Sequence, residues 1–110
     1  MTVFTRILHD RDDPAADIPV RVFPPVAKHG DWRCRVEIHW PGQPWGCDVG
    51  GIDAIQAFEL ALQMVGTQLY CSDLHAAGRL VWLEPGDGYG FPVPRTIRDM
   101  LVGRDREGFG

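Results

Sequence analysis

The sharpest alternation of apolar and polar residues in this chain lies at residues 32–40, "WRCRVEIHW". A period of two predicts a β-strand with one face packed and the other in water. The apolar face carries Trp32, Cys34, Val36, Ile38 and Trp40, and the polar face carries Arg33, Arg35, Glu37 and His39.

A second alternating run, "WGCDVG" at residues 45–50, follows after the turn sequence "PGQP". Its apolar positions again share one face, and Asp48 lies on the other. A four-residue loop and the apolar pattern agree on the register of an antiparallel hairpin. The predicted pairs are Trp40 with Trp45, Ile38 with Cys47, and Val36 with Val49.

The next segment predicts one long helix over about residues 53–71. Asp53 suits the N-cap, and Gln56 three residues later completes a capping-box pattern. Gly66 inside this helix costs about 1 kcal/mol relative to Ala, which indicates the close approach of a neighbouring strand. The apolar stripe at three-and-four spacing is Ile55, Phe58, Leu62, Val65 and Leu69.

Shorter elements are expected elsewhere. "TVFTRIL" predicts a first strand, residues 9–17 an exposed charged loop, and "IPVRVF" a strand that ends before two prolines. "RLVWLE" predicts a further strand, and "RTIRDML" a short C-terminal helical turn. The polar, Gly-rich residues 103–110 predict a flexible tail.

Together these elements predict an α+β fold, in which an antiparallel sheet of three to five strands packs on one long amphipathic helix. The Trp-bearing face of the hairpin would meet the apolar stripe of the helix to form the core. A length of 110 residues suits one domain, expected at residues 1–102.

Composition narrows the classes of function. The formal net charge of −4 disfavours general nucleic-acid binding, which needs a basic surface. No apolar run approaches the ~18 residues of a membrane span. The N-terminal segment turns acidic early and lacks the layout of a signal peptide, so we expect a cytoplasmic protein with no membrane partner.

The cysteines are weak candidates for chemistry. A zinc site of three cysteines and His75 is disfavoured because no Cys-x-x-Cys pair exists and the predicted register separates Cys34 from Cys47 by roughly 13 Å. Cys71 and His75 could form a thiol–imidazole pair, but reactivity needs a polar, part-exposed setting that a sequence does not show. We expect no catalytic residue, no metal and no cofactor.

Three segments in order, "DWRCRVEIHWPG", "GIDAIQAFELALQMVGTQL" and "GFPVP", resemble a group of small bacterial proteins that carry a domain of unknown function. The resemblance covers about residues 19–94 and implies a shared fold. It brings no activity and no site residue. The matching residues are Gly51, Asp53, Gln56, Ala57, Gly90, Phe91 and Pro92.

The remaining candidate is a surface. The polar hairpin face could bind a protein, because mixed charge steers partners, and Tyr89 in the Gly-rich loop 85–94 could be an exposed anchor. Simple solvation of this face is the alternative. The candidate set is Arg33, Arg35, Glu37, His39, Asp48 and Tyr89.

Two hypotheses for function therefore stand. The first is a non-catalytic protein-interaction module of a bacterial cytoplasm, binding an unknown protein or itself as a homodimer through a sheet edge or the polar face. The second is a small ligand-binding domain or enzyme, with its pocket near the N-terminus of helix 53–71 and the 85–94 loop.

Overall fold

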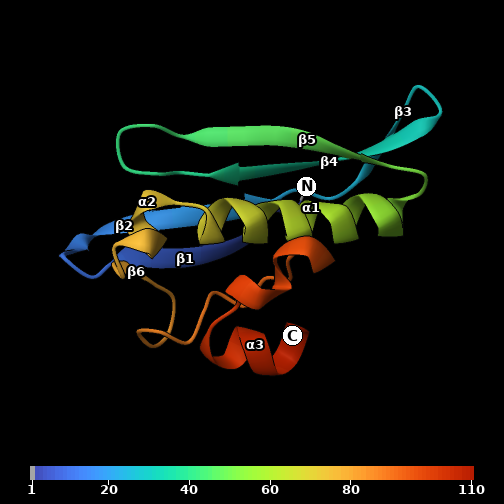
Figure 1. Cartoon of the computed structure of the whole chain (residues 1–110). Coiled ribbons are helices and arrows are strands. Elements are labelled where there is room, and N and C mark those ends of the chain that lie inside the picture. Colours follow the sequence, from blue (N-terminus) through green and yellow to red (C-terminus); the bar gives the residue numbers. More distant parts are fainter. Residues whose placement is uncertain (1) are drawn as a thin grey trace.

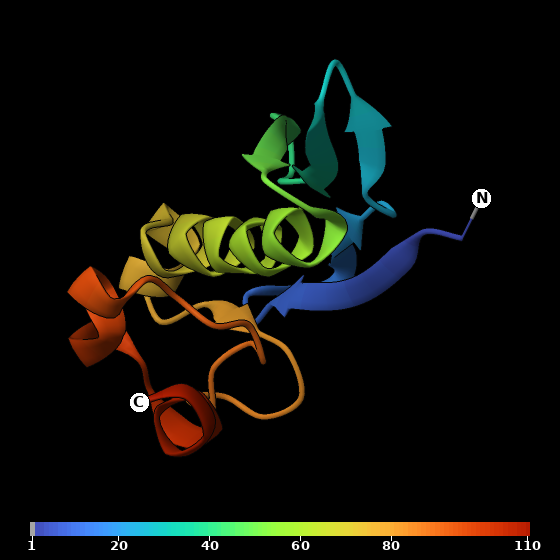
Figure 2. The ribbon, with the colours of Figure 1, turned by 90° about the vertical axis from the view of Figure 1, so that its right-hand side faces the viewer.

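The computed structural model describes residues 2–110, which form an antiparallel sheet packed on one long helix, α1 (Ala54–Tyr70). This confirms the predicted α+β class, although the described residues form six strands rather than three to five. Helix α1 lies between the β4–β5 hairpin and the C-terminal segments (Figures 1 and 2). The strands are β1 (Phe4–Asp10), β2 (Asp13–Val22), β3 (Val26–Lys28), β4 (Asp31–Ile38), β5 (Trp45–Gly51) and β6 (Leu80–Val81).

Strand β4 organises the sheet. It pairs with β5 along one edge and with β2 and β3 along the other, while β1 lies beyond β2 and β6 beyond β1. His29 and Gly30 connect β3 to β4 with φ of 52° and 83°, the paired positive values of a type I′ hairpin turn. Because β5 pairs with β4 alone among the described strands, it is outermost on its side of the sheet.

The prediction of an exposed charged loop at residues 9–17 is wrong. Strand β1 continues to Asp10 and β2 begins at Asp13, so only two residues turn. The register jumps from His9 opposite Asp17 to Asp10 opposite Asp13, which leaves residues 14–16 as a bulge. Pro14 fits there because a bulge does not need its missing N–H.

The predicted register of the β4–β5 hairpin is shifted by two residues. Ile38 pairs with Trp45, Val36 with Cys47 and Cys34 with Val49, and residues 39–44 form the loop. Pro41 and Pro44 have no N–H with which to extend the ladder toward Trp40. A shift of two preserves the alternation, so every side chain keeps its predicted face.

Helix α1 begins as predicted but presents a different stripe to the core. Asp53 Oδ1 accepts the N–H of Gln56 at 2.8 Å, as the capping-box pattern predicted, but Gln56 Oε1 accepts the N–H of Ile52 at 2.8 Å and not that of Asp53. Ile55 is 77% exposed, whereas Ala57, Ala61, Val65 and Leu69 are fully buried. Small side chains at the first two positions let the helix lie close to the sheet, which apolar spacing alone did not indicate.

The C-terminal segments cover the other side of α1. A Cβ built on Gly66 would overlap the carbonyl oxygen of Pro92, so the expected close approach exists, although the neighbour is an extended segment outside the sheet. A 3-10 helix, η1 (Arg95–Met100), follows where a helical turn was predicted.

Residues 103–110, expected to be a flexible tail, contain helix α3 (Gly103–Phe109). Asp105 in this helix is 2% exposed. Its carboxylate accepts hydrogen bonds from the Tyr70 hydroxyl at 2.5 Å and from the N–H groups of Tyr89 and Gly90, each at 2.8 Å. These bonds fasten α3 to α1 and to the loop before η1.

Candidate functional site at the β5 edge

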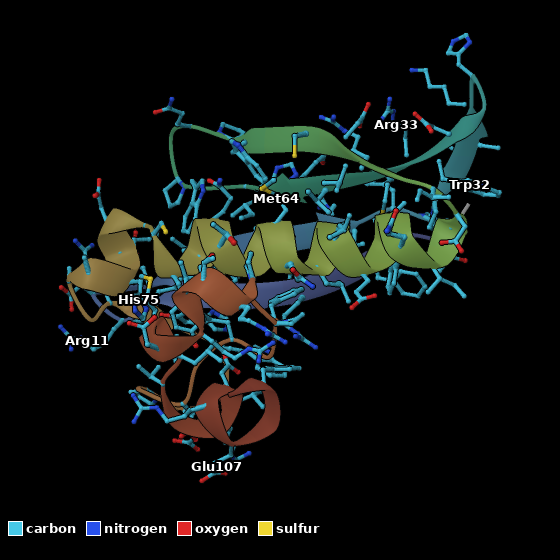
Figure 3. The ribbon with its side chains drawn as sticks, turned by 45° about the vertical axis from the view of Figure 1, so that its right-hand side comes forward. Arg11, Trp32, Arg33, Met64, His75 and Glu107 are labelled. Atoms are coloured by element: carbon cyan, nitrogen blue, oxygen red, sulfur yellow. The ribbon has the colours of Figure 1, made fainter. Side chains whose placement is uncertain are left out.

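The polar face of the β4–β5 hairpin forms as the sequence predicted. Arg35 Nε donates to Glu37 Oε2 at 2.9 Å and Arg35 Nη1 to Asp48 Oδ1 at 3.3 Å. His39 Nε2 lies 3.0 Å from Glu37 Oε1. Figure 3 shows Arg33 on the side of the hairpin that faces away from α1. The structure thus brings five of the six candidate residues together.

Hydrogen bonding keeps this face charged. Partial burial raises the pKa of Glu37, but hydrogen bonds with Arg35 and His39 outweigh it and hold that pKa below its usual range. The pKa of Arg35 is raised because Glu37 and Asp48 accept its hydrogen bonds. Both groups are therefore ionised at neutral pH.

Two glycines let the arginines lie over strand β5. A Cβ built on Gly46 would be 2.8 Å from Arg35 Nη2, and one built on Gly50 would overlap Arg33 Nη1. The guanidinium groups thus occupy space that side chains of β5 would otherwise fill. The positive charges of Arg33 and Arg35, which belong to β4, therefore lie over the backbone of β5.

The backbone of β5 has one open edge. Phe23 N–H donates to Arg35 O and His39 N–H to Pro19 O, so odd-numbered residues of β4 point their backbone groups toward β2. Even-numbered residues of β4 then bond β5, through Trp45, Cys47 and Val49. The N–H and C=O groups of the intervening residues of β5 point outward, where no strand within residues 2–110 pairs with them. These residues are Gly46, Asp48 and Gly50.

An open groove of about 580 Å³ lies at the N-terminal end of β5. Because the chain reverses between β5 and α1, the C-terminal end of α1 faces Trp45. The Trp side chains were expected in the core, but Trp40 and Trp45 are only partly buried and form one wall. The lining comprises Asp10, Trp40, Pro41, Gln43, Pro44, Trp45, Gln68, Cys71, Ser72, Asp73, Leu74 and Arg79.

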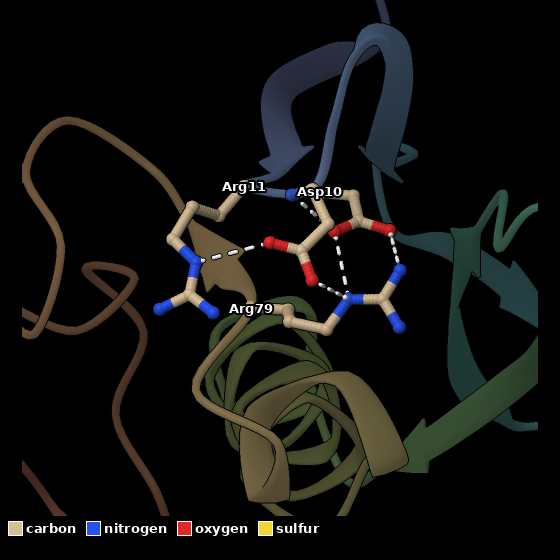
Figure 4. Close-up of polar contacts among 4 residues, drawn as sticks. Asp10, Arg11 and Arg79 are labelled. Carbon is tan, nitrogen blue, oxygen red and sulfur yellow. Dashed lines mark hydrogen bonds and ion pairs between the residues drawn. The ribbon is translucent and has the colours of Figure 1, made fainter.

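A charged pair closes the far side of this groove. Arg79 donates to both carboxylate oxygens of Asp10, from Nε at 3.1 Å and from Nη2 at 2.6 Å (Figure 4). Asp10 is 5% exposed, and the hydrogen bond from Arg79 lowers its pKa. The pair ties the β1–β2 turn to the segment before β6, so both charges are already occupied by a structural contact.

Tyr89 does not belong to the exposed surface. It is 4% exposed, its hydroxyl contacts His75 Nδ1, and its ring centroid lies 5.2 Å from that of Tyr70. Gly88 and Gly90 flank it with φ of 83° and 75°, and this curvature turns the ring inward. A Gly-rich loop suggested exposure because its buried partner, Asp105, is distant in sequence.

The cysteine and histidine candidates do not converge. Cys34 is buried and its thiol contacts Phe23 O at 3.2 Å, Cys71 is exposed, and all three thiols are free. The corrected register brings Cys34 and Cys47 to a diagonal separation of roughly 7–8 Å. Within residues 2–110, no three His, Cys, Asp or Glu side chains are grouped to hold a metal. Burial lowers the pKa of His75, and its Nδ1 is engaged by Tyr89, not by the Cys71 thiol.

A smaller hollow of about 190 Å³ lies where the ligand-binding hypothesis placed its pocket. Phe58 and Leu62 of α1 line it together with Phe91. Arg6 also lines it, but its guanidinium donates to the carbonyls of Tyr89 and Gly90 and lies 3.9 Å from the centroid of the Trp82 ring. The hollow is mainly apolar, and its one charged side chain is already satisfied.

Comparison with known families gives one result. A family model described as a domain of unknown function, DUF6968, matches residues 4–93. The chain belongs to this family. No curated protein and no solved structure matches the chain. The match covers the whole sheet, α1 and the groove, and it begins earlier than the resemblance at 19–94 had indicated. None of the helices in residues 2–110 has the length and apolar character of a membrane span.

Sequence reasoning missed two parts of the site in this DUF6968 domain. Arg21 of β2 places Nη1 3.2 Å from His39 Nε2 and so extends the polar face. Alternation within "IPVRVF" could have identified it. Gly46 and Gly50 carried no signal, because their role appears only when the neighbouring arginines are placed.

Proposed function

We propose that this DUF6968 domain is a non-catalytic protein-interaction module that binds an extended segment of a partner protein as an added strand on β5. The observation that carries the proposal is the open edge of this seven-residue strand, with outward backbone groups at Gly46, Asp48 and Gly50. An unpaired strand edge is a template for another chain.

The other edges are poorer templates. Strand β6 has two residues and β3 has three, too few for a stable added strand. Strand β1 pairs with β6 only at His9 and Asp10, which leaves residues 4–8 open on that side, a shorter stretch than β5. Strand β5 also lacks Pro and Lys, the residues that commonly block an edge. Among the described strands, β5 therefore offers the longest unblocked edge at the margin of the sheet.

A peptide partner is favoured over self-pairing. A two-fold axis through the middle of β5 would set Asp48 opposite Asp48 of the second copy, and like charges directly opposite each other destabilise a strand pair. The partner proposed is therefore a different protein, with homodimerisation as the alternative outcome.

The non-catalytic part of the proposal is supported by how the charges are used. Asp10 is bonded to Arg79 beside the groove, and Glu37 is bonded to Arg35 on the polar face. Groups committed to such pairs are poorly placed to move protons. We also propose a bacterial cytoplasmic setting, where free thiols such as exposed Cys71 stay reduced.

Substitution at Asp48 tests the proposal. Asp48→Pro removes an outward N–H without removing a β4–β5 hydrogen bond, while the matched control Asp48→Thr keeps that N–H. Both variants lose the same carboxylate. Random 12-residue peptides displayed on phage would be selected on the wild-type domain and then measured on each variant.

We expect selected peptides to bind the Thr variant and to lose at least tenfold in affinity for the Pro variant, with both variants folded by circular dichroism. Selection of no peptide, or of peptides that bind both variants equally, would refute strand addition at β5.

A further inference from the structure

The side chains beside the open edge indicate which peptide it takes. This inference rests on the proposed function. We propose that β5 selects a strand with acidic residues at two positions four residues apart, opposite Gly50 and Gly46, followed by a bulky apolar residue that enters the Trp40–Trp45 groove.

The alternation of an antiparallel pair fixes the face. Residues of the added strand that bond to Gly46, Asp48 and Gly50 lie directly opposite them, and their side chains project on the same side of the sheet. That side is the polar face, where the side chains of Arg33 and Arg35 lie over the two glycines. The next strand runs only about 4.8 Å farther out, within reach of both guanidinium groups.

The nitrogens nearest the glycines are the uncommitted ones. Arg33 contacts Asp31 through Nη2 at 3.7 Å, and Arg35 uses Nε and Nη1 for its two carboxylate partners. Within residues 2–110, Arg33 Nη1 and Arg35 Nη2 take part in none of the hydrogen bonds or ion pairs of these two arginines. A Cβ built on Gly50 would overlap Arg33 Nη1, and one built on Gly46 would lie 2.8 Å from Arg35 Nη2. Carboxylate is the planar acceptor that fits a guanidinium edge.

The peptide position between the two acidic residues lies opposite Asp48 and has a different charge preference. A residue opposite Asp48 faces a carboxylate, so a neutral or basic side chain is favoured there and an acidic one is repelled. Arg33 has a single, long ion pair, whereas Arg35 already has two carboxylate partners. The acid opposite Gly50 therefore contributes more than the acid opposite Gly46.

The other face of the added strand meets apolar surface. Its residues opposite Cys47 and Val49 project toward the α1 side, where Met64 points from the helix to the hairpin (Figure 3). The residue opposite Trp45 would lie beside the groove, which Trp45 and Gln68 both line. From its N-terminus to its C-terminus, an antiparallel peptide runs from Gly50 to Trp45. Its preferred order is therefore acid, apolar, neutral, apolar, acid, bulky apolar.

Defined peptides test this order by fluorescence anisotropy on the full chain. The probe carries Glu-Val-Thr-Val-Glu-Leu between soluble Gly-Ser flanks, and one control has Lys in place of both Glu. A second control, Val-Glu-Thr-Glu-Val-Leu, keeps the composition but moves the acids to the other face. We expect both controls to bind at least tenfold more weakly, and the binding of the probe to weaken as salt rises.

A charge exchange locates the contact. Arg33→Glu should weaken the Glu probe about tenfold and strengthen a peptide that has Lys only opposite Gly50. Exposed Arg104→Glu, in α3, is the control and should change neither affinity. An unfolded Arg33→Glu variant would bind neither peptide. Stronger binding of the Lys peptide by this variant would therefore show a direct charge contact at residue 33.

The outcomes separate the two proposals. Equal binding of the Glu, Lys and face-shifted peptides, with sensitivity to Asp48→Pro, would overturn the acidic preference but leave strand addition standing. Binding of none of the peptides, including those selected from the random library, would overturn both proposals. Dimerisation through β5 that excludes the Glu probe would also overturn this inference in favour of a second copy of the chain.

Discussion

Asp105 anchors the C-terminal helix, and replacing it with Ala should destabilise the whole domain. The substitution removes the shared acceptor of the Tyr70 hydroxyl and of the Tyr89 and Gly90 N–H groups. Burial, followed by the hydrogen bond to Asp105, raises the pKa of Tyr70 well above its usual range, so its hydroxyl stays a donor. All three donors would lose their partner inside the protein.

The expected magnitude follows from these three bonds. A hydrogen bond to a charged acceptor contributes about 1.5–3 kcal/mol, so simple addition gives at least about 4.5 kcal/mol. The bonds act as a unit, and α3 can detach so that water reaches the donors, which lowers the cost. We expect Asp105→Ala to reduce the free energy of unfolding by about 3 kcal/mol and Tm by roughly 13 °C.

Urea unfolding followed by circular dichroism measures this change, with Glu107→Ala as the matched control. Glu107 is exposed on the same helix and points away from the protein (Figure 3), so its loss should cost less than about 0.5 kcal/mol. Amide exchange at Tyr89 and Gly90 should accelerate only in the Asp105 variant. Equal stabilities and exchange rates for the two variants would show that residues 103–110 are a flexible tail after all.

Two further predictions concern the packing around α1. Gly66→Ala should destabilise the domain by about 2 kcal/mol in urea titrations despite the better helix propensity of Ala, because the new Cβ overlaps Pro92 O. The control Gly108→Ala, with open space around it, should be neutral or stabilising by up to about 1 kcal/mol. A stabilised Gly66 variant would show that residues 90–94 move aside at little cost. Burial lowers the pKa of His75 in the folded state, so its contribution to stability is complete above the unfolded pKa of about 6.5 and is lost as pH falls below it. Wild-type Tm should therefore drop more between pH 7.5 and 5.5 than the Tm of His75→Asn, and parallel curves would contradict this assignment.

Hydrophobic periodicity correctly located the elements whose structure is determined by a regular pattern within their own sequence. Strand β4 and helix α1 each carry a long regular pattern, and Asp53 with Gln56 marks the start of the helix by a local hydrogen bond. The same alternation placed Arg35 and Asp48 on one face correctly, since a face depends only on whether a position is odd or even.

Features that depend on distant partners could not be read in this way. A two-residue shift of the β4–β5 hairpin leaves every face unchanged, so the apolar pattern could not detect it. Burial of Tyr89 depends on Asp105, which is 16 residues away and lies in a polar sequence. The uncommitted Arg33 Nη1 over Gly50 is likewise a product of tertiary placement.

The bond between Asp105 and the N–H of Tyr89 links a residue beyond the family match to residues inside it. A fragment designed to stop at residue 93 would also omit Leu101, which is completely buried. The residues matched by the family model therefore leave out Asp105 and Leu101, which complete the buried contacts of this molecule.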